Sequence, residues 1–139
     1  MENKLSGKKY LRLFDANANR CREGLRVIED TARFVFGSGP LYKKTRGLRH
    51  SADKLTRELY GGLIGHRDSV KDSGRRIPEG KRESHRAVVQ SNFKRVEESL
   101  RVLEEYSRLV CPEAGPGFKK IRFSVYTLEK RFSKLYASA

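Results

Sequence analysis

One segment of this sequence occurs twice, and that repeat limits the fold more than any other feature. Shifting the chain by 75 residues places residues 17–34 on residues 92–109, and eight of the eighteen aligned pairs are identical. The identical pairs form the pattern N-x-x-R-x-x-E-x-L-R-V-x-E and are Asn17/Asn92, Arg20/Arg95, Glu23/Glu98, Leu25/Leu100, Arg26/Arg101, Val27/Val102, Glu29/Glu104 and Arg33/Arg108. A shift of 76 extends the alignment, with residues 42–46 falling on residues 118–122. We therefore expect one domain over residues 1–139 that holds two copies of one unit, roughly 15–62 and 90–137.

Apolar residues recur at three- and four-residue spacing through four segments, which is the period of a helix with one buried face. The predicted helices run from Asp15, as N-cap, to Phe36; from Pro40 to a Gly61-Gly62 stop; from His85 to Val110; and roughly from Gly117 to Ala137. Residues 64–84 are polar and show no period, so they form a long loop, a kind of segment that is usually functional or disordered. The sequence thus predicts an all-α fold, a duplicated helical hairpin forming a four-helix or slightly larger bundle with a long central crossover loop.

The composition restricts the partners without choosing one. The net charge is +14, from 31 Lys and Arg against 17 Asp and Glu, and such a field attracts phosphorylated metabolites, nucleotides, nucleic acids or an acidic protein. The two cysteines have no partner at metal-ligand spacing and are expected to be reduced structural thiols. No apolar run approaches the roughly 18 residues that a membrane span needs, and no leader is visible, so we expect a cytoplasmic protein without a membrane partner.

A polar strip runs along the repeated helix between two apolar stripes. In the first copy it holds Asn17, Arg20, Gly24 and Thr31, with Glu23 at its edge, and in the second Asn92, Arg95, Ser99, Tyr106 and Glu98. The flanking stripes are Ala18, Cys21, Leu25, Ile28 and Ala32 on one side, and Val27 and Phe34 on the other.

This strip is expected to be at least half buried, with Arg20 held by Asn17 and Glu23. The small Gly24 and Ser99 would leave room for an anionic ligand beside the arginines. The strip could equally be the polar contact of a duplicated interface, and both interpretations stay open. By the same periodicity, Arg26, Glu29, Arg33 and their counterparts are predicted to lie on a solvated outer face.

The loop carries the second group of candidate residues. Asp68 and Asp72 are oxygen ligands of the kind that Mg²⁺ uses. Its basic residues could clamp phosphates, and they are Arg67, Lys71, Arg75 and Arg76. A mobile basic loop without a site is the alternative. The stretch from Gly37 to Thr45 has no glycine before its Lys-Thr pair and follows a predicted helix, so it is not a nucleotide-binding P-loop.

Four separated motifs resemble one known family. They are residues 15–30 (DANANRCREGLRVIED), Leu48-Arg49-His50, Arg67-Asp68-Ser69 with Asp72 and Gly74, and residues 92–105 (NFKRVEESLRVLEE). Together they are similar to the helical domain fused in front of bacterial thiamine phosphate synthases, which also stands alone and is described as a second type of hydroxymethylpyrimidine phosphate kinase. The resemblance covers roughly residues 10–136.

The resemblance implies phosphorylation of 4-amino-5-hydroxymethyl-2-methylpyrimidine phosphate to its diphosphate, with ATP and Mg²⁺, in thiamine biosynthesis. It implies Arg67, Asp68 and Asp72 as catalytic residues, the two aspartates also holding the metal. The implied substrate- or phosphate-binding residues are Asn17, Asn19, Arg20, Glu23, His50, Asn92, Arg95 and Glu98. A lone helical histidine such as His50 is otherwise more often structural.

The expected partners are the phosphorylated pyrimidine and the nucleotide, with a thiamine phosphate synthase and a second copy of the chain as possible protein partners. Two other functions stay open. One is a basic helical nucleic-acid-binding protein, although the signature arginines alternate with glutamates and no helix-turn-helix or zinc-finger spacing is visible. The other is a non-catalytic partner module of the synthase.

Overall fold

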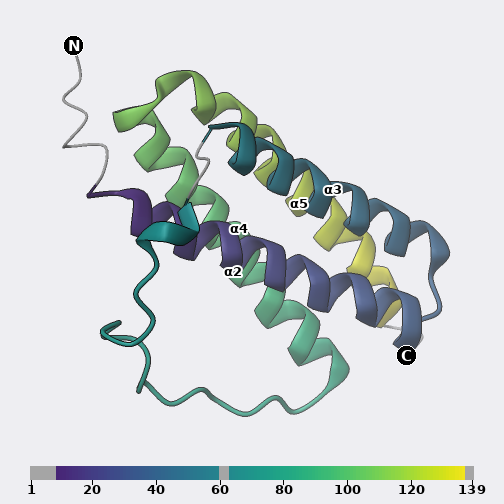
Figure 1. The fold of residues 1–139 in the computed structure, drawn as a ribbon. Coiled ribbons are helices and arrows are strands. Elements are labelled where there is room, and N and C mark those ends of the chain that lie inside the picture. Colours follow the sequence, from purple (N-terminus) through teal and green to yellow (C-terminus); the bar gives the residue numbers. More distant parts are fainter. Residues whose placement is uncertain (1–8, 60–62, 137–139) are drawn as a thin grey trace.

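The computed structural model describes residues 9–59 and 63–136 of the chain, and all of its regular structure is helical. Four long helices, α2 (Leu11–Asp30), α3 (Gly39–Leu59), α4 (His85–Val110) and α5 (Gly115–Tyr136), form the body of the molecule (Figure 1). Three short turns join them: a π-helical turn at Thr31–Val35 and 3₁₀ turns at Leu63–His66 and Pro112–Ala114. The predicted all-α bundle is confirmed.

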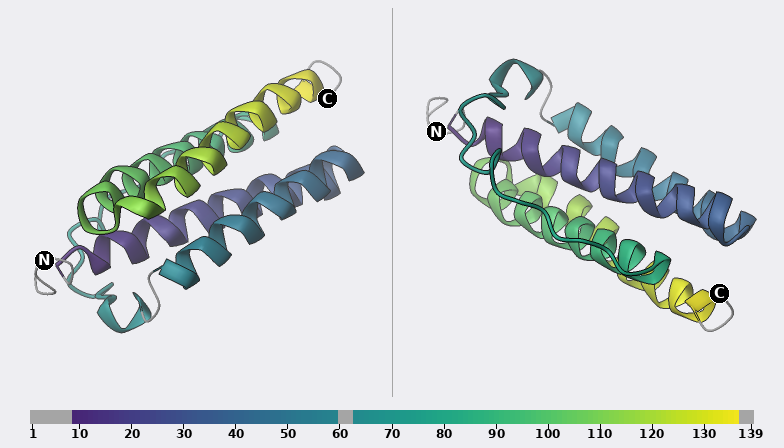
Figure 2. Two further views of the ribbon diagram at one scale, coloured as in Figure 1. Left: turned by 90° about the horizontal axis from the view of Figure 1, so that it is seen from above. Right: turned by 90° about the horizontal axis from the view of Figure 1, so that it is seen from below.

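The helices lie in two layers, α2 beside α3 and α4 beside α5 (Figure 2). Helices α2 and α4 pack against each other across the layers, and their buried faces carry the predicted period. Large side chains with less than 2% exposure fill the core, among them Phe14, Leu25, Ile28, Phe93, Leu100, Leu103, Phe118, Leu128 and Phe132. The crossover loop lies below α2 in Figure 1, then runs beside α4 and joins the first turn of that helix (Figures 1 and 2).

Several predicted helix ends were wrong. Helix α2 begins four residues earlier than predicted, at Leu11, and its N-cap is Tyr10, so Asp15 lies inside the helix and caps nothing. Leu11 and Phe14 continue the apolar period backward, which favours helix before Asp15. Helix α4 runs from His85 to Val110 as predicted, whereas α3 and α5 begin one and two residues earlier than predicted. The Gly61-Gly62 stop and Ala137 lie outside the described residues. The loop prediction holds except that its first residues belong to the 3₁₀ turn at Leu63–His66.

The two repeated helices cross at equivalent positions. A Cβ added to Gly24 would lie 2.6 Å from Val96 Cγ2, and Cys21 forms a side-chain hydrogen bond with Ser99. The 75-residue shift pairs Cys21 with Val96 and Gly24 with Ser99, so these two contacts are the same contact made by the two copies. An approximate two-fold axis therefore passes between α2 and α4 beside these residues. Burial at this crossing raises the pKa of the Cys21 thiol to about 12, as expected for an unreactive structural cysteine.

Glu29 and its counterpart Glu104 lie inside the bundle, and the prediction that they face solvent was wrong. Glu29 is 2% exposed and accepts a hydrogen bond from Arg49 Nε at 2.9 Å, while Glu104 is fully buried and accepts one from Arg122 Nε at 2.9 Å. Arg122 aligns with the exposed Arg46 rather than with Arg49, so equivalent carboxylates are neutralised by arginines from different turns. Helices α3 and α5 cover the side that periodicity alone assigns to solvent.

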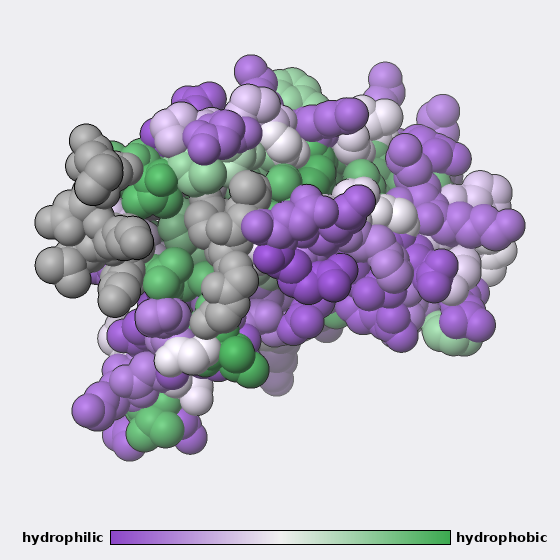
Figure 3. Space-filling view, turned by 45° about the horizontal axis from the view of Figure 1, so that its top comes forward, coloured by the Kyte–Doolittle hydropathy of each residue, from purple (hydrophilic) through white to green (hydrophobic). Residues whose placement is uncertain are grey.

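The second apolar stripe, Val27 and Phe34, lies on the surface, although a buried position was expected. Phe34 is 69% exposed and Val27 is 36% exposed, whereas Arg26 and Arg33 are exposed as expected. Polar side chains cover most of the face seen in Figure 3, with smaller apolar patches between them. The core therefore depends on one stripe of each repeated helix, and the polar strip borders solvent.

Candidate functional site

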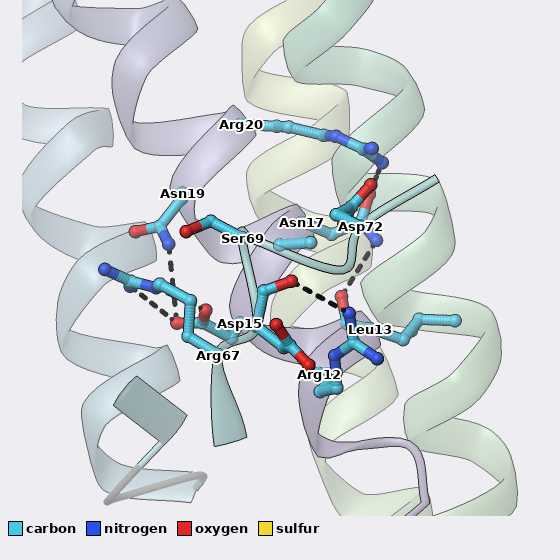
Figure 4. Close-up of a pocket in the computed structure, with 11 residues that line it drawn as sticks. Arg12, Leu13, Asp15, Asn17, Asn19, Arg20, Arg67, Ser69 and Asp72 are labelled. Carbon is cyan, nitrogen blue, oxygen red and sulfur yellow. Dashed lines mark hydrogen bonds and ion pairs between the residues drawn. The ribbon is translucent and has the colours of Figure 1, made fainter. Parts of the chain in front are cut away.

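A cavity of about 400 Å³ lies between the first half of α2 and the loop that follows the 3₁₀ turn at Leu63–His66 (Figure 4). Its walls bring together two motifs that are some fifty residues apart in the sequence, and its lining residues are Arg12, Leu13, Asp15, Ala16, Asn17, Asn19, Arg20, Arg67, Asp68, Ser69 and Asp72. All three predicted catalytic residues and three predicted binding residues are among them. Sequence reasoning missed Arg12 and Asp15 as site residues.

Arg67 attaches the loop to α2. Its Nε and Nη2 atoms donate to the two carboxylate oxygens of Asp15 at 2.8 and 2.9 Å, a bidentate pair, and the Asp15 residue is 7% exposed (Figure 4). This hydrogen bonding raises the pKa of the Arg67 guanidinium above its usual value. One edge of the guanidinium is thus already occupied, so Arg67 positions the loop over the cavity. The signal for Asp15 was its place in the family motif, but its side chain suits an N-cap equally well.

Two loop carboxylates face the same cavity. Asp68 Oδ1 accepts a hydrogen bond from the Lys71 backbone N–H at 3.1 Å, and Asp72 Oδ1 accepts one from the Gly74 N–H at 2.7 Å. Arg12 Nη2 donates to the Asp68 carbonyl oxygen at 3.2 Å, which gives the loop a second attachment to α2.

These two carboxylates suit one type of metal. No group of three or more His, Cys, Asp or Glu side chains able to hold a metal is present in residues 9–59 and 63–136. Mg²⁺ is commonly held by one or two carboxylates together with waters and substrate phosphates, so Asp68 and Asp72 fit that ion better than a closed protein cage.

The polar strip of α2 supplies the other wall. Asn17 Nδ2 donates to the Leu13 carbonyl oxygen at 2.9 Å, and its Oδ1 accepts a hydrogen bond from Arg20 Nη1 at 3.3 Å. Arg20 is exposed and has no carboxylate partner in the described part of the chain, so most of its donors are available to an anion. The prediction that Arg20 is buried was wrong, and Glu23 is exposed and lines none of the cavities described here. Asn19 donates to Asp15 Oδ1 at 3.4 Å.

A second cavity of about 420 Å³ adjoins the first and shares Asn17 and Arg20 with it. Its remaining lining residues are Glu79, Arg95, Glu98, Ser99 and Val102. Arg95 Nη2 pairs with the Glu79 carboxylate at 2.8 Å, and both side chains are about half exposed or more. The structure therefore brings Arg95 and Glu98 of the second copy beside Asn17 and Arg20 of the first.

Besides Glu23, two more predicted binding residues, Asn92 and His50, lie away from the cavity walls. Asn92 Nδ2 donates to the Val88 carbonyl oxygen at 2.8 Å, which is the same local bond that Asn17 makes to Leu13 in the first copy. His50 is exposed on α3 and lines none of the five cavities described in this structure, so the structure does not bring it to the other site residues. Helix α3 instead contributes Asp53 and Arg57 to a third cavity of about 320 Å³, which shares Asp15, Asn19 and Arg67 with the first.

Comparison with known proteins gives a consistent family. Residues 12–131 match the ThiD2 family. The chain is 44% identical over 122 residues to the thiamine-phosphate synthase of a Nostoc species, which covers 85% of this chain and 34% of that protein. It is 42% identical to the thiamine-phosphate synthase of Gloeobacter violaceus, covering 86% of this chain and 35% of that protein.

The chain thus spans about a third of the length of the curated relatives it matches. No solved structure matches it significantly. No helix in the described ranges is long and apolar enough to cross a membrane. The match over residues 12–131 includes the lining residues of both cavities and all or most of each long helix, and the chain belongs to the ThiD2 family.

Proposed function

We propose that this chain acts in thiamine biosynthesis as a phosphotransferase that converts 4-amino-5-hydroxymethyl-2-methylpyrimidine phosphate to its diphosphate with ATP and Mg²⁺. The observation that carries the proposal is the first cavity, where two loop carboxylates and the unpaired Arg20 face one space. Membership of the ThiD2 family and similarity to thiamine-phosphate synthases support the pathway. The same relatives support an enzymatic role.

The reaction makes limited demands on the protein. A phosphate oxygen of the substrate attacks the γ-phosphorus of ATP, and the bond from that phosphorus to the bridging oxygen breaks as ADP leaves. The attacking oxygen is already ionised, so no general base is needed, and catalysis depends on positioning and on neutralising charge. The first cavity, lined by three arginines and three aspartates, supplies groups that can bind phosphates and a divalent cation.

Each of the six predicted site residues that line the cavity then has a defined role. Asp68 and Asp72 hold Mg²⁺, which when bound neutralises and orients the ATP phosphates. Arg20 binds the transferring or accepting phosphate through its free donors, and Asn17 keeps its guanidinium in the cavity. Asn19 hydrogen-bonds polar atoms of the substrate. Arg67 keeps both aspartates over the cavity through its pair with Asp15.

The test is diphosphate formation by the pure, folded chain from the pyrimidine monophosphate, ATP and Mg²⁺, followed by ³¹P NMR or mass spectrometry. Asp72→Ala is expected to lower the rate by about 100-fold, because loss of a charged ligand at a phosphoryl-transfer site weakens transition-state stabilisation by several kcal/mol. Glu83→Ala is the matched control, since Glu83 is an exposed carboxylate of the same loop that lines none of the cavities. No diphosphate from the wild-type chain would contradict the proposal.

A partner module of thiamine-phosphate synthase is the second candidate. The observation that favours it is that this chain matches only about a third of each such relative. Under this function, adding the chain would change the rate or stability of a synthase while no diphosphate forms. Nucleic-acid binding, the remaining alternative, would show as binding that weakens steeply with salt and is insensitive to Asp72→Ala.

A further inference from the structure

The second cavity lies where equivalent residues of the two copies meet. Arg20 and Arg95 are each one residue before the paired positions Cys21 and Val96 at the crossing of α2 and α4. Residues near a two-fold axis lie close to their own counterparts, and both arginines line this cavity. The repeat therefore concentrates two guanidinium groups at one place.

The cavity is lined by two arginines and two glutamates, and one ion pair joins them in the described residues. Arg20 hydrogen-bonds the neutral Asn17, and Arg95 is paired with Glu79 at 2.8 Å. Glu98 also lines the cavity, but it forms no ion pair with either arginine in the described residues. Two arginines in one cavity favour an anion between them, and Glu79 supplies a carboxylate to one of them.

Glu79 belongs to the loop, which the duplication does not contain. The loop is attached to α2 through Arg67 and Asp15 beside the first cavity, and to α4 through Glu79 and Arg95 beside the second. Residues 67–79 thus extend past both cavities along the α2 and α4 side of the molecule (Figure 2). The two attachments differ in strength, because Asp15 is buried and bound through both oxygens, whereas the Glu79 side chain is 75% exposed.

An exposed ion pair of this kind contributes little and is easily replaced. A phosphate group carries more charge than a carboxylate and can accept bidentate hydrogen bonds from two arginines at once, which makes it the stronger ligand.

We propose that Arg20 and Arg95 form a second phosphate subsite, and that Glu79 occupies it in the free protein as an internal carboxylate that a phosphate group displaces. The ligand class is the phosphate or diphosphate group of a small molecule. This inference deepens the proposed function, because the subsite adjoins the first cavity through Arg20 and would hold a second phosphate of substrate or product. Displacement of Glu79 would free the second attachment of the loop while the Arg67 attachment stays in place.

Calorimetric titration of the full chain with inorganic pyrophosphate tests the subsite without requiring kinase activity. Glu79→Gln is expected to bind pyrophosphate about two- to five-fold more tightly than the wild type, since an exposed competing ion pair is removed. The matched control removes the same charge from the loop outside the cavity: Glu83→Gln. In an Arg95→Gln background, the gain from Glu79→Gln should disappear.

Hydrogen exchange supplies a second readout. Pyrophosphate should increase amide exchange in residues 79–84 of the wild type, because their attachment to α4 is lost, and should leave residues near Arg67 unchanged. Equal gains for Glu79→Gln and Glu83→Gln, a gain that persists without Arg95, or slower exchange in residues 79–84 would each overturn the proposal. A chain that makes diphosphate but fails these tests retains the proposed function, whereas one that passes them and makes no diphosphate retains only the subsite.

Discussion

Arg20 and Arg95 occupy the same position in the two copies of one helix, yet they have different partners. Arg20 hydrogen-bonds the neutral Asn17 and borders two cavities, whereas Arg95 is paired with Glu79 from the loop. The duplication therefore reproduces helix-to-helix contacts, and the unduplicated loop makes the two copies functionally different. The two copies also differ in their buried ion pairs, in their contacts at the helix crossing and in the charge of one aligned pair. Substitutions at equivalent positions can measure these differences.

The buried glutamates should show the largest difference. Glu104→Ala is expected to lower the free energy of unfolding by about 3–5 kcal/mol, because it leaves Arg122 buried without its carboxylate. Glu29→Ala should cost less, about 1–3 kcal/mol, since the Arg49 side chain is 18% exposed and can reach water. Urea unfolding at pH 7 measures both, with the exposed Glu105→Ala as control. An equal or greater loss for Glu29→Ala would show that the two pairs are energetically equivalent.

Substitution of Arg20 and Arg95 should give the second largest difference, in catalytic efficiency. Arg20→Gln is expected to lower kcat/KM for diphosphate formation by about 10- to 100-fold, because a charge-assisted hydrogen bond to phosphate is worth about 1.5–3 kcal/mol. Arg95→Gln should cost less, about tenfold or below, because binding there must first displace Glu79. Steady-state kinetics measure both, with the exposed Arg33→Gln as control. A larger loss for Arg95→Gln would reverse this assignment.

The helix crossing offers a smaller test. Gly24→Ala places a Cβ 2.6 Å from Val96 Cγ2, and the stiff valine side chain cannot turn away without cost. We expect destabilisation of about 1–2 kcal/mol after the gain in helix propensity, measured by thermal unfolding. Ser99→Ala, at the equivalent position, should change stability by less than about 1 kcal/mol because it adds no atom. A stabilising Gly24→Ala would mean that the helices separate at low cost.

The smallest expected effect is on the pH dependence of stability, through the charge of Glu97. Glu97 is buried on α4 beside Glu129 and Lys94, while its counterpart Arg22 is exposed. Burial, together with a hydrogen bond and charge repulsion from Glu129, raises the pKa of Glu97 to about 7, against the opposing effect of Lys94.

The folded state therefore binds this proton more tightly than the unfolded state, and stability falls as the pH rises from about 4.5 to about 7. Glu97→Gln should remove that fall and stabilise the protein by on the order of 1 kcal/mol at pH 8. Unfolding measured from pH 4 to pH 8 tests this, with the exposed Glu58→Gln as control. An unchanged pH dependence would contradict the raised pKa.

The sequence by itself determined the helical architecture. Apolar spacing and the repeat are local and periodic, so they fixed the number of long helices, the core stripe of α2 and α4, and the position of the long loop. The repeat also identified Asn17, Arg20 and Arg95 as a polar strip, and the family motif pointed to Arg67, Asp68 and Asp72, which line one cavity with Asn17 and Arg20.

Only the tertiary structure decided which polar groups meet. Asp15 suits an N-cap, and it became the buried partner of Arg67 because a loop fifty-two residues away returns to it. Glu29 and Glu104 are buried because α3 and α5 cover that side of the repeated helices. Glu104 is paired with Arg122, which does not align with Arg49, the partner of Glu29. Helical periodicity predicts which face of a single helix is buried, whereas ion pairing depends on where the other elements lie in space. For the same reason, nothing in the sequence pointed to Glu79 as a site residue, although it is the partner of Arg95.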